Sequence, residues 1–313
     1  MTLDEIRMLA AGLGHPVVTG EPESTGRFPD GRRYRVEIPS CEGPVVMQAV
    51  VDEAHDRGVR VHRVSQGSGV MMLTDDEIRE LVELGAEGVE VSLFLGPRGA
   101  WDTGGQSLVT NATAGVARGA AGVAACVAEA RRAAALGIRG LLVADVGVLA
   151  VLGGLRAAGE LPGCLVLKPS VLLPAANPAT ARELARLGAD TINVATDLSP
   201  VPPAEVRAAV SVPLDVYVEV PDDQGGFVRF YEVPEIVRAA APVYVKLGVR
   251  NAPAIYPSGL HLLETAVRLG RERVRRAELC LRLLGELAPD LVEEVGEEQP
   301  ADLGIPEVVR APA

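Results

Sequence analysis

Short apolar runs rich in β-branched residues alternate along this chain with longer segments rich in Ala, Leu, Glu and Arg. Apolar residues with a period of two indicate strands, and apolar residues three or four positions apart indicate helices. The strand pattern predicts strands over 34–40, 59–66, 89–95, 140–146, 164–170, 191–197, 215–220 and 243–249. The helical pattern predicts helices over 42–57, 75–85, 113–136, 148–158, 177–187, 203–209, 232–240 and 258–287.

Strand–helix pairs repeated in this order predict an α/β protein with one (β/α)8 barrel of the TIM type over residues 34–288. A doubly wound sheet is the alternative, but a Gly-rich phosphate turn would usually follow its first strand. The chain has Ser40-Cys-Glu-Gly-Pro there instead. We expect residues 1–33 to form a lead-in helix and a loop that plugs the barrel bottom, and residues 289–313 to form an acidic tail.

The net charge and the hydropathy of the chain limit the classes of partner that such a barrel could bind. A net charge of −12 argues against a nucleic acid or an anionic membrane surface, because either would need a basic face. No apolar stretch approaches the roughly 18–20 residues of a membrane span, and the first residues lack the pattern of a signal peptide. We expect a cytoplasmic protein with a small-molecule substrate, and homo-oligomerisation stays open.

The cysteines do not form a recognisable site. They are far apart and lack C-x-x-C spacing, which argues against metal ligation by Cys alone and against a disulfide framework in the cytosol. These residues are Cys41, Cys126, Cys164 and Cys280. Cys41 falls between a predicted strand and a helix, where a thiol can have a lowered pKa. A buried, unreactive thiol is the more common case.

Two lysines stand out in a chain whose other basic residues, apart from histidine, are all arginine. Lys168 ends the run Leu165-Val-Leu-Lys, and Lys246 ends Val243-Tyr-Val-Lys. A buried ammonium is costly unless it is paired, neutralised or used. Lysine, unlike arginine, can lose its proton and act as a base or as an imine-forming nucleophile. The alternative is a pair of structural ion-pair partners in an Arg-rich chain.

Alternation along the strands directs many polar residues towards the barrel axis. On the second strand either His62 or Arg63 points inward, and Gln66 lies where the loop above it begins. The inward set comprises Glu37, Glu90, Asp145, Lys168, Asn193, Glu219 and Lys246. So many polar strand-end positions exceed what packing needs, and barrel enzymes place their chemistry at the carboxyl ends of the strands. We therefore expect an active site at this end.

The predicted reaction is a lyase or isomerase reaction on a small carbonyl or carboxylate compound, without a redox cofactor or a metal. Lys168 is the predicted base or imine former, because Asp145 and Asn193 would flank it and leave it accessible. Lys246, between Glu37 and Glu219, would stay protonated and bind substrate. The full assignment is Lys168, Glu37, Glu219 and Asp145 as catalytic residues, with Lys246, Glu90, Asn193, His62, Arg63 and Gln66 as substrate-binding residues.

Two other functions stay open at this point. A metal-dependent enzyme would hold a divalent cation on Glu37, Glu90, Asp145 and Glu219, with His62. A non-catalytic barrel would bind a metabolite or a partner protein. Residues 97–112, a long Gly-rich segment after the third strand, could form a lid or a solvated loop.

Residues 140–198 resemble the peptidase U32 family. Val143-Ala-Asp-Val-Gly-Val-Leu is similar to a strand motif of that family, and the segment from Asn177-Pro-Ala-Thr to Leu187-Gly-Ala-Asp-Thr is similar to its next helix. The resemblance implies a TIM-like barrel and peptidase activity, so the metal-dependent alternative would be a metal-assisted amide hydrolase. Several relatives carry a Cys-ligated iron–sulfur cluster. Here the place of the family's His and Cys motif reads Val218-Glu-Val-Pro-Asp-Asp. No iron–sulfur cluster is therefore expected.

Overall fold

The computed structural model describes residues 3–15, 23–86, 88–96 and 115–292. The strands are β1 (Tyr34–Pro39), β2 (Arg63–Gln66), β3 (Glu90–Phe94), β4 (Gly140–Val143), β5 (Val166–Pro169), β6 (Ile192–Asn193), β7 (Leu214–Glu219) and β8 (Val243–Leu247). The helices that follow them are α2 (Pro44–Asp56), α3 (Asp75–Gly85), α4 (Gly119–Ala135), α5 (Val146–Ala157), α6 (Pro178–Arg186), α7 (Val201–Ala209), α8 (Val233–Ala240) and α9 (Leu263–Leu287). This confirms the predicted alternation of strands and helices.

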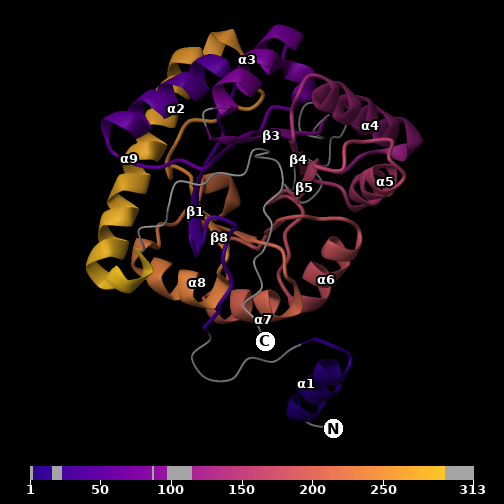
Figure 1. Ribbon diagram of the computed structural model, residues 1–313, viewed down its shortest axis with the longest axis vertical. Helices are drawn as coiled ribbons and strands as arrows, with labels where there is room; N and C mark the ends of the chain where they lie inside the picture. The colour runs from indigo at the N-terminus through magenta and orange to yellow at the C-terminus, as the bar shows by residue number, and fades with distance from the viewer. Residues whose placement is uncertain (1–2, 16–22, 87, 97–114, 293–313) are drawn as a thin grey trace.

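The strands form one parallel sheet in the order β5-β4-β3-β2-β1-β8-β7-β6. The two end strands approach each other, because Asp190 N donates to Leu167 O over 2.9 Å and Asn193 Nδ2 donates to Pro169 O over 2.7 Å. The result is a nearly closed barrel inside a ring of helices (Figure 1). The predicted (β/α)8 fold is confirmed.

The main apolar core lies between the strands and the ring of helices. Outward residues such as Val36, Leu141 and Val245 are almost fully buried there. The helix after the last strand, α9, packs against α2 and completes the ring (Figure 1). A Cβ on Gly270 would lie 3.0 Å from a methyl carbon of Val50, so the close approach of these two helices requires glycine.

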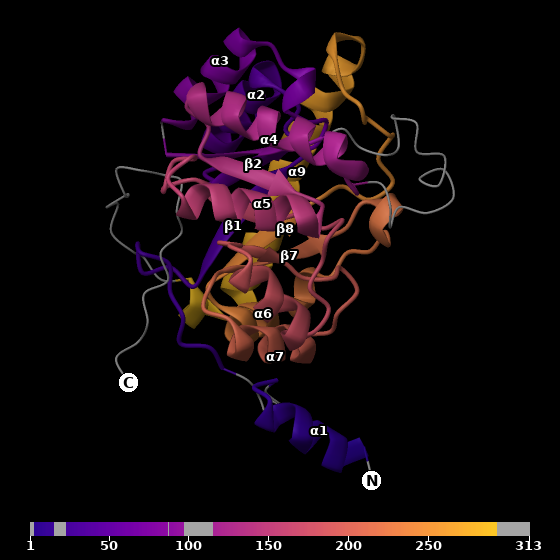
Figure 2. The same cartoon turned by 90° about the vertical axis from the view of Figure 1, so that its right-hand side faces the viewer.

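The N-terminal part of the chain has two roles in the structure. Helix α1 (Leu3–Gly12) lies outside the ring of helices, near α6 and α7 (Figures 1 and 2). Phe28 is fully buried, and its ring meets Tyr244 of β8 edge-on at 4.9 Å. Since Tyr244 sits near the amino end of its strand, Phe28 lies at the bottom of the barrel. The bounds 1–33, 34–288 and 289–313 stay predictions, and residues 293–313 lie outside the described ranges.

No helix in the described part of the chain combines the length and the apolar character needed to cross a bilayer. The predicted loop at 97–112 also falls outside the described ranges.

Candidate active site

The lowest polar layer of the barrel is a set of buried ion pairs just above Phe28. Arg35 of β1 donates to Glu90 of β3 over 2.7 Å and to Asp30 over 3.0 Å. The Tyr244 hydroxyl also donates to Glu90, at 2.8 Å. Burial raises the pKa of Glu90, although Arg63 and Arg35 oppose this effect. Glu90 thus points inward as predicted, but it lies at the bottom of the barrel and does not line the pocket described below.

The middle layer is centred on Glu37, which is fully buried. Lys168 Nζ lies 2.6 Å from both carboxylate oxygens, Arg63 Nε lies 2.9 Å from Oε2, and Ser65 Oγ donates to Oε1 over 2.8 Å. Burial alone would raise the pKa of Glu37, but the cations Arg63, Lys168 and Lys246 hold it well below its usual range. Glu37 is therefore an anion that fixes the cations around it.

Asp215 of β7 is the second carboxylate of this layer. It accepts from Arg63, accepts from Thr191 Oγ1 over 2.6 Å, and lies 3.8 Å from Lys168 Nζ. Sequence reasoning did not single out Asp215. Its position is two residues before Tyr217 in an alternating strand, which is a signal that could have placed it inside.

The middle layer contains more positive than negative groups. Arg63, Lys168 and Lys246 surround Glu37 and Asp215, whereas the lower layer is balanced by itself, with Arg32 and Arg35 on Asp30 and Glu90. Burying an uncompensated charge is costly. The middle layer is electrically neutral only when one of its two lysines has lost a proton.

Lys246 forms the top of this cluster. Its Nζ donates to Asn193 Oδ1 over 2.7 Å, lies 3.4 Å from Glu37 Oε1 and sits 4.4 Å from the centre of the Tyr217 ring. Burial lowers the pKa of Lys246 to about 8, with Glu37 opposing and Arg63 adding to the shift. Asn193 is itself fixed by its bond to the Pro169 carbonyl.

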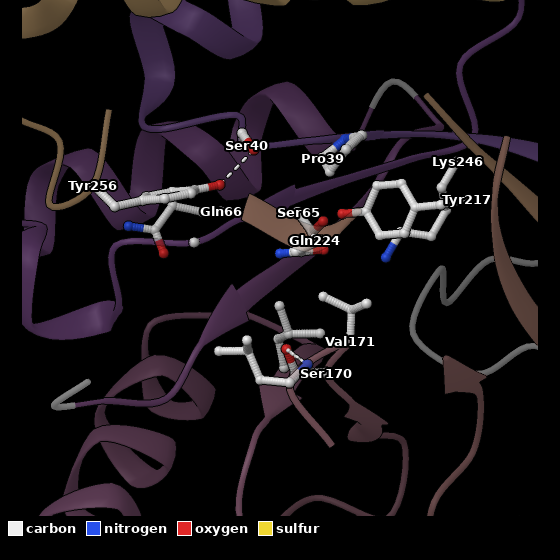
Figure 3. Close-up of a pocket in the computed structure, with 13 residues that line it drawn as sticks. Pro39, Ser40, Ser65, Gln66, Ser170, Val171, Tyr217, Gln224, Lys246 and Tyr256 are labelled. Carbon is white, nitrogen blue, oxygen red and sulfur yellow. Dashed lines mark hydrogen bonds between the residues drawn. The ribbon is translucent and has the colours of Figure 1, made fainter. Parts of the chain in front are cut away.

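A pocket opens directly above Lys246, at the carboxyl ends of the strands (Figure 3). Its cavity volume is about 30 Å³, and the pocket is open to solvent on one side. Its lining comprises Pro39, Ser40, Ser65, Gln66, Gly67, Leu142, Ser170, Val171, Leu172, Tyr217, Gln224, Lys246 and Tyr256. Lys168 is not part of this lining and is fully buried. Of the two lysines, Lys246 therefore reaches the pocket.

This arrangement reverses the partners expected for the lysines. Lys168 was expected beside Asp145 and Asn193, but it lies on Glu37 and is sealed from the pocket. Burial lowers the pKa of Lys168 well below its ordinary value, Arg63 adds to the shift and Glu37 opposes it. Lys246 was expected between Glu37 and Glu219, but of these two carboxylates it meets Glu37 alone, at the longer distance of 3.4 Å.

The loop after β2 closes one side of the pocket. Gln66 is part of the pocket lining. Its side-chain amide also fixes the loop, because it donates to Gly69 O over 3.1 Å and accepts from Gly69 N over 3.0 Å. The carboxylate of Glu42 accepts from the backbone N–H groups of Gly67 and Ser68. A Cβ on Gly67 would lie 2.6 Å from the Tyr256 ring, so glycine is required for this tyrosine to pack against the loop.

Glu219 is not in the barrel interior. The register between β7 and β8 shifts between Tyr217 and Glu219, and such a bulge changes which side later residues face. Glu219 accepts from Arg250 N over 2.9 Å and lies 3.6 Å from Arg276 of α9. Burial raises its pKa. The predicted inward position of Glu219 is wrong because period-two alternation does not survive the bulge.

Asp145 also lies elsewhere than expected. β4 ends at Val143, and Asp145 is the N-cap of α5, where its carboxylate accepts from Val148 N over 2.8 Å and from Ala117 N over 3.1 Å. A short acid before a helix commonly satisfies free N–H groups in this way. Its predicted place in the inward cluster is wrong, because the helix begins earlier than the sequence suggested.

On β2 it is Arg63 that points inward, not His62. The Arg63 guanidinium stacks over the Tyr244 ring at 3.4 Å, whereas His62 Nδ1 accepts from Val36 N over 3.0 Å. Burial lowers the pKa of His62 well below its usual value, and nearby arginines add to the shift. The imidazole is therefore neutral and faces away from the pocket.

The five side chains considered for a divalent cation are dispersed. Glu37, Glu90, Asp145, Glu219 and His62 lie in five separate environments, each with partners of its own. In the described ranges no three His, Cys, Asp or Glu side chains gather closely enough to hold a metal ion together.

Cys41 lies at the carboxyl end of β1 but is buried. Burial raises the pKa of its thiol, so the lowered pKa considered for this position is not found.

Comparison with known proteins identifies no family and leaves the chemistry open. No family model matches the chain, and no curated protein sequence matches it. Among solved structures, the native KDPGal structure is 11% identical, with a TM-score of 0.44, and covers 80% of this chain and 96% of its own. A U32 peptidase is 17% identical, with a TM-score of 0.42, and covers 76% and 98%. The homocysteine methyltransferase of Escherichia coli is 13% identical, with a TM-score of 0.42, and covers 69% and 92%. A U32 peptidase is thus one of several equally similar barrels.

Proposed function

We propose that the pocket is the active site of a lyase or isomerase that acts on a small carbonyl compound through the Lys246 amine. The observation that carries the proposal is the position of this amine. It lines the pocket, and in the layer below it the charges of Arg63 and Lys168 already balance those of Glu37 and Asp215. A lysine with a pKa of about 8 is partly unprotonated near neutral pH, so it can act as a base or as a nucleophile.

The proposed step begins with attack of the neutral Lys246 nitrogen on the substrate carbonyl carbon. The C–N bond forms, the carbonyl oxygen leaves as water, and one proton taken up from solvent leaves the product as a protonated imine. The protonated imine adds one positive charge to a layer that was neutral. A substrate with one carboxylate would cancel that charge, which favours a monoanionic carbonyl compound.

The surrounding residues fit supporting roles in this chemistry. Asn193 orients the amine, and the Tyr217 hydroxyl points towards Ser65 and Gln224 across the pocket, where it could exchange a proton with substrate (Figure 3). Lys168 holds Glu37 through two contacts of 2.6 Å, whereas Lys246 lies 3.4 Å from it, so we assign the positive charge to Lys168 and the lost proton to Lys246. Lys246 thereby takes the role that the sequence suggested for Lys168.

Reductive trapping tests the proposal, because the chain has only two lysines and the adduct can be mapped without ambiguity. The protein is incubated with pyruvate or 2-oxobutyrate and sodium borohydride and then digested. An adduct on Lys246, absent in Lys246→Arg and retained in Lys168→Met, is expected. An adduct confined to Lys168 or to the amino terminus would overturn the proposal, as would the absence of any adduct.

A further inference from the structure

The inward face at the top of the barrel is divided into two halves of different chemistry. The inward residues near the ends of β3 and β4 form a separate apolar cluster, made of Phe94, Leu142 and Ala144, with Leu172 packed against it. Leu142 and Leu172 also line the pocket, together with Val171. One wall of the pocket is therefore aliphatic.

The opposite wall carries the polar groups. Figure 3 shows Ser65, Tyr217 and Lys246 on one side of the pocket and Val171 on the other. The polar residue nearest the aliphatic wall, Ser170, already accepts from Leu172 N over 3.2 Å. No carboxylate belongs to the pocket lining within the described ranges.

We infer that the substrate is a 2-oxo acid with a short, unsubstituted alkyl side chain that rests on Leu142, Val171 and Leu172 while its carbonyl carbon meets Lys246. This inference rests on the proposed function. It adds the identity of the group that the carbonyl carbon bears besides its oxygen and the carboxylate, namely a short alkyl chain. Each methylene buried against the wall improves binding about fourfold. A hydroxyl on the alkyl chain would lose hydrogen bonds to water against Leu142, Val171 and Leu172, whose side chains offer none in return.

Two matched ligand series test the inference. The first contains the straight-chain 2-oxo acids from glyoxylate to 2-oxohexanoate, and the second contains the carboxylates of the same length without the keto group. Binding is measured by calorimetric titration of the full chain, and trapping by borohydride is measured separately. We expect the affinity in both series to rise about fourfold per methylene up to an optimum length and then to fall.

Variants of the wall then identify where the alkyl chain lies. Leu172→Ala removes side-chain volume from a partly buried loop position, and the optimum should move to a longer ligand. Leu172→Phe fills the same space, and the optimum should move to a shorter ligand. Leu260→Ala is the matched control, since Leu260 is 84% exposed on the loop after β8 and does not line the pocket. Thermal unfolding of each variant verifies that it is folded.

The outcomes separate this inference from the proposed function. If affinity depends on chain length but no adduct forms on Lys246, the alkyl site is supported and the proposed imine chemistry is contradicted. An adduct on Lys246 whose yield does not depend on chain length would keep the chemistry and overturn the alkyl site. Tighter binding of 3-hydroxypyruvate than of 2-oxobutyrate would overturn it too, as would an optimum that is the same in both Leu172 variants.

Discussion

Removing the charge of Glu37 is the sharpest perturbation of the buried cluster. Glu37→Gln keeps the shape of the side chain but leaves Arg63, Lys168 and Lys246 facing only Asp215. Breaking a buried ion pair by removing one partner costs about 3 to 5 kcal/mol. Because Glu37 holds Lys168 through two contacts of 2.6 Å, we expect the loss to fall in this range.

Removing Lys168 should be easier to tolerate. In Lys168→Met, Glu37 keeps Arg63, and Lys246 can take up a proton to restore the missing charge. We expect a loss of about 1 to 3 kcal/mol. The double variant, Glu37→Gln with Lys168→Met, removes one charge of each sign. It should therefore be more stable than Glu37→Gln alone, with a coupling energy of at least about 2 kcal/mol.

Urea unfolding at pH 7 measures all three stabilities, with the slope compared to detect a change in the unfolded state. In Lys168→Met the remaining lysine is Lys246, so the pH dependence of acetylation at this residue, measured on the digested peptide apart from the amino terminus, reports its pKa. That pKa should rise above about 8, because the neighbouring cation Lys168 is gone and the oxygens of Glu37 that it held are free to pair with Lys246. Additive losses in the double variant, or a loss below about 1 kcal/mol in Glu37→Gln, would refute the charge-balance argument.

Three further predictions follow from the site. The pKa of Lys246 is about 8 in the folded protein and 10.5 in a free lysine, so between these pH values the unfolded state binds more protons than the folded state. The free energy of unfolding should therefore rise with pH across this window, by up to about 3 kcal/mol. Urea unfolding of Lys246→Met, measured over the same pH range, should lack this rise. Asp145→Ala should cost about 1 kcal/mol in thermal unfolding and leave trapping at Lys246 intact; a loss of trapping would return Asp145 to the site. Asn193→Asp places a carboxylate beside Lys246 and should shift the pH profile of trapping to more alkaline values; an unchanged profile would contradict the contact.

The fold could be predicted because each βα unit carries its own local signal. Thr74 and Glu77 form a capping box at the start of α3, and this helix begins and ends at the predicted residues, 75 and 85. All strands except β7 proved shorter than predicted, most of all β6, which has two residues. There the chain after Asn193 pairs with Ala175 of the preceding loop, a tertiary contact that no local pattern encodes.

The site could be predicted only in part, because alternation tells which residues face inward but not how high they lie. Glu37 and Lys168 are both inward as predicted, and they are in direct contact. Glu90 is inward as well, but it lies a layer lower with Arg35. Height depends on the stagger between strands, which is set by register across the whole barrel. Glu219 shows the second limit, since one bulge inverts the facing of the residues after it.

The positions of the two lysines give each of them a separate role. An apolar replacement of a buried ion pair is often neutral or stabilising, so a polar column that runs from Arg35 up to the pocket is poorly explained by stability alone. Lys168 occupies both oxygens of Glu37 and leaves Lys246 a carboxylate contact of only 3.4 Å. Because Lys168 binds both oxygens of Glu37, Lys246, which lines the pocket, has no close carboxylate among the described residues to stabilise its charged form. On this reasoning Lys168 acts through Lys246, by setting the pH at which the amine on the pocket floor becomes free to react.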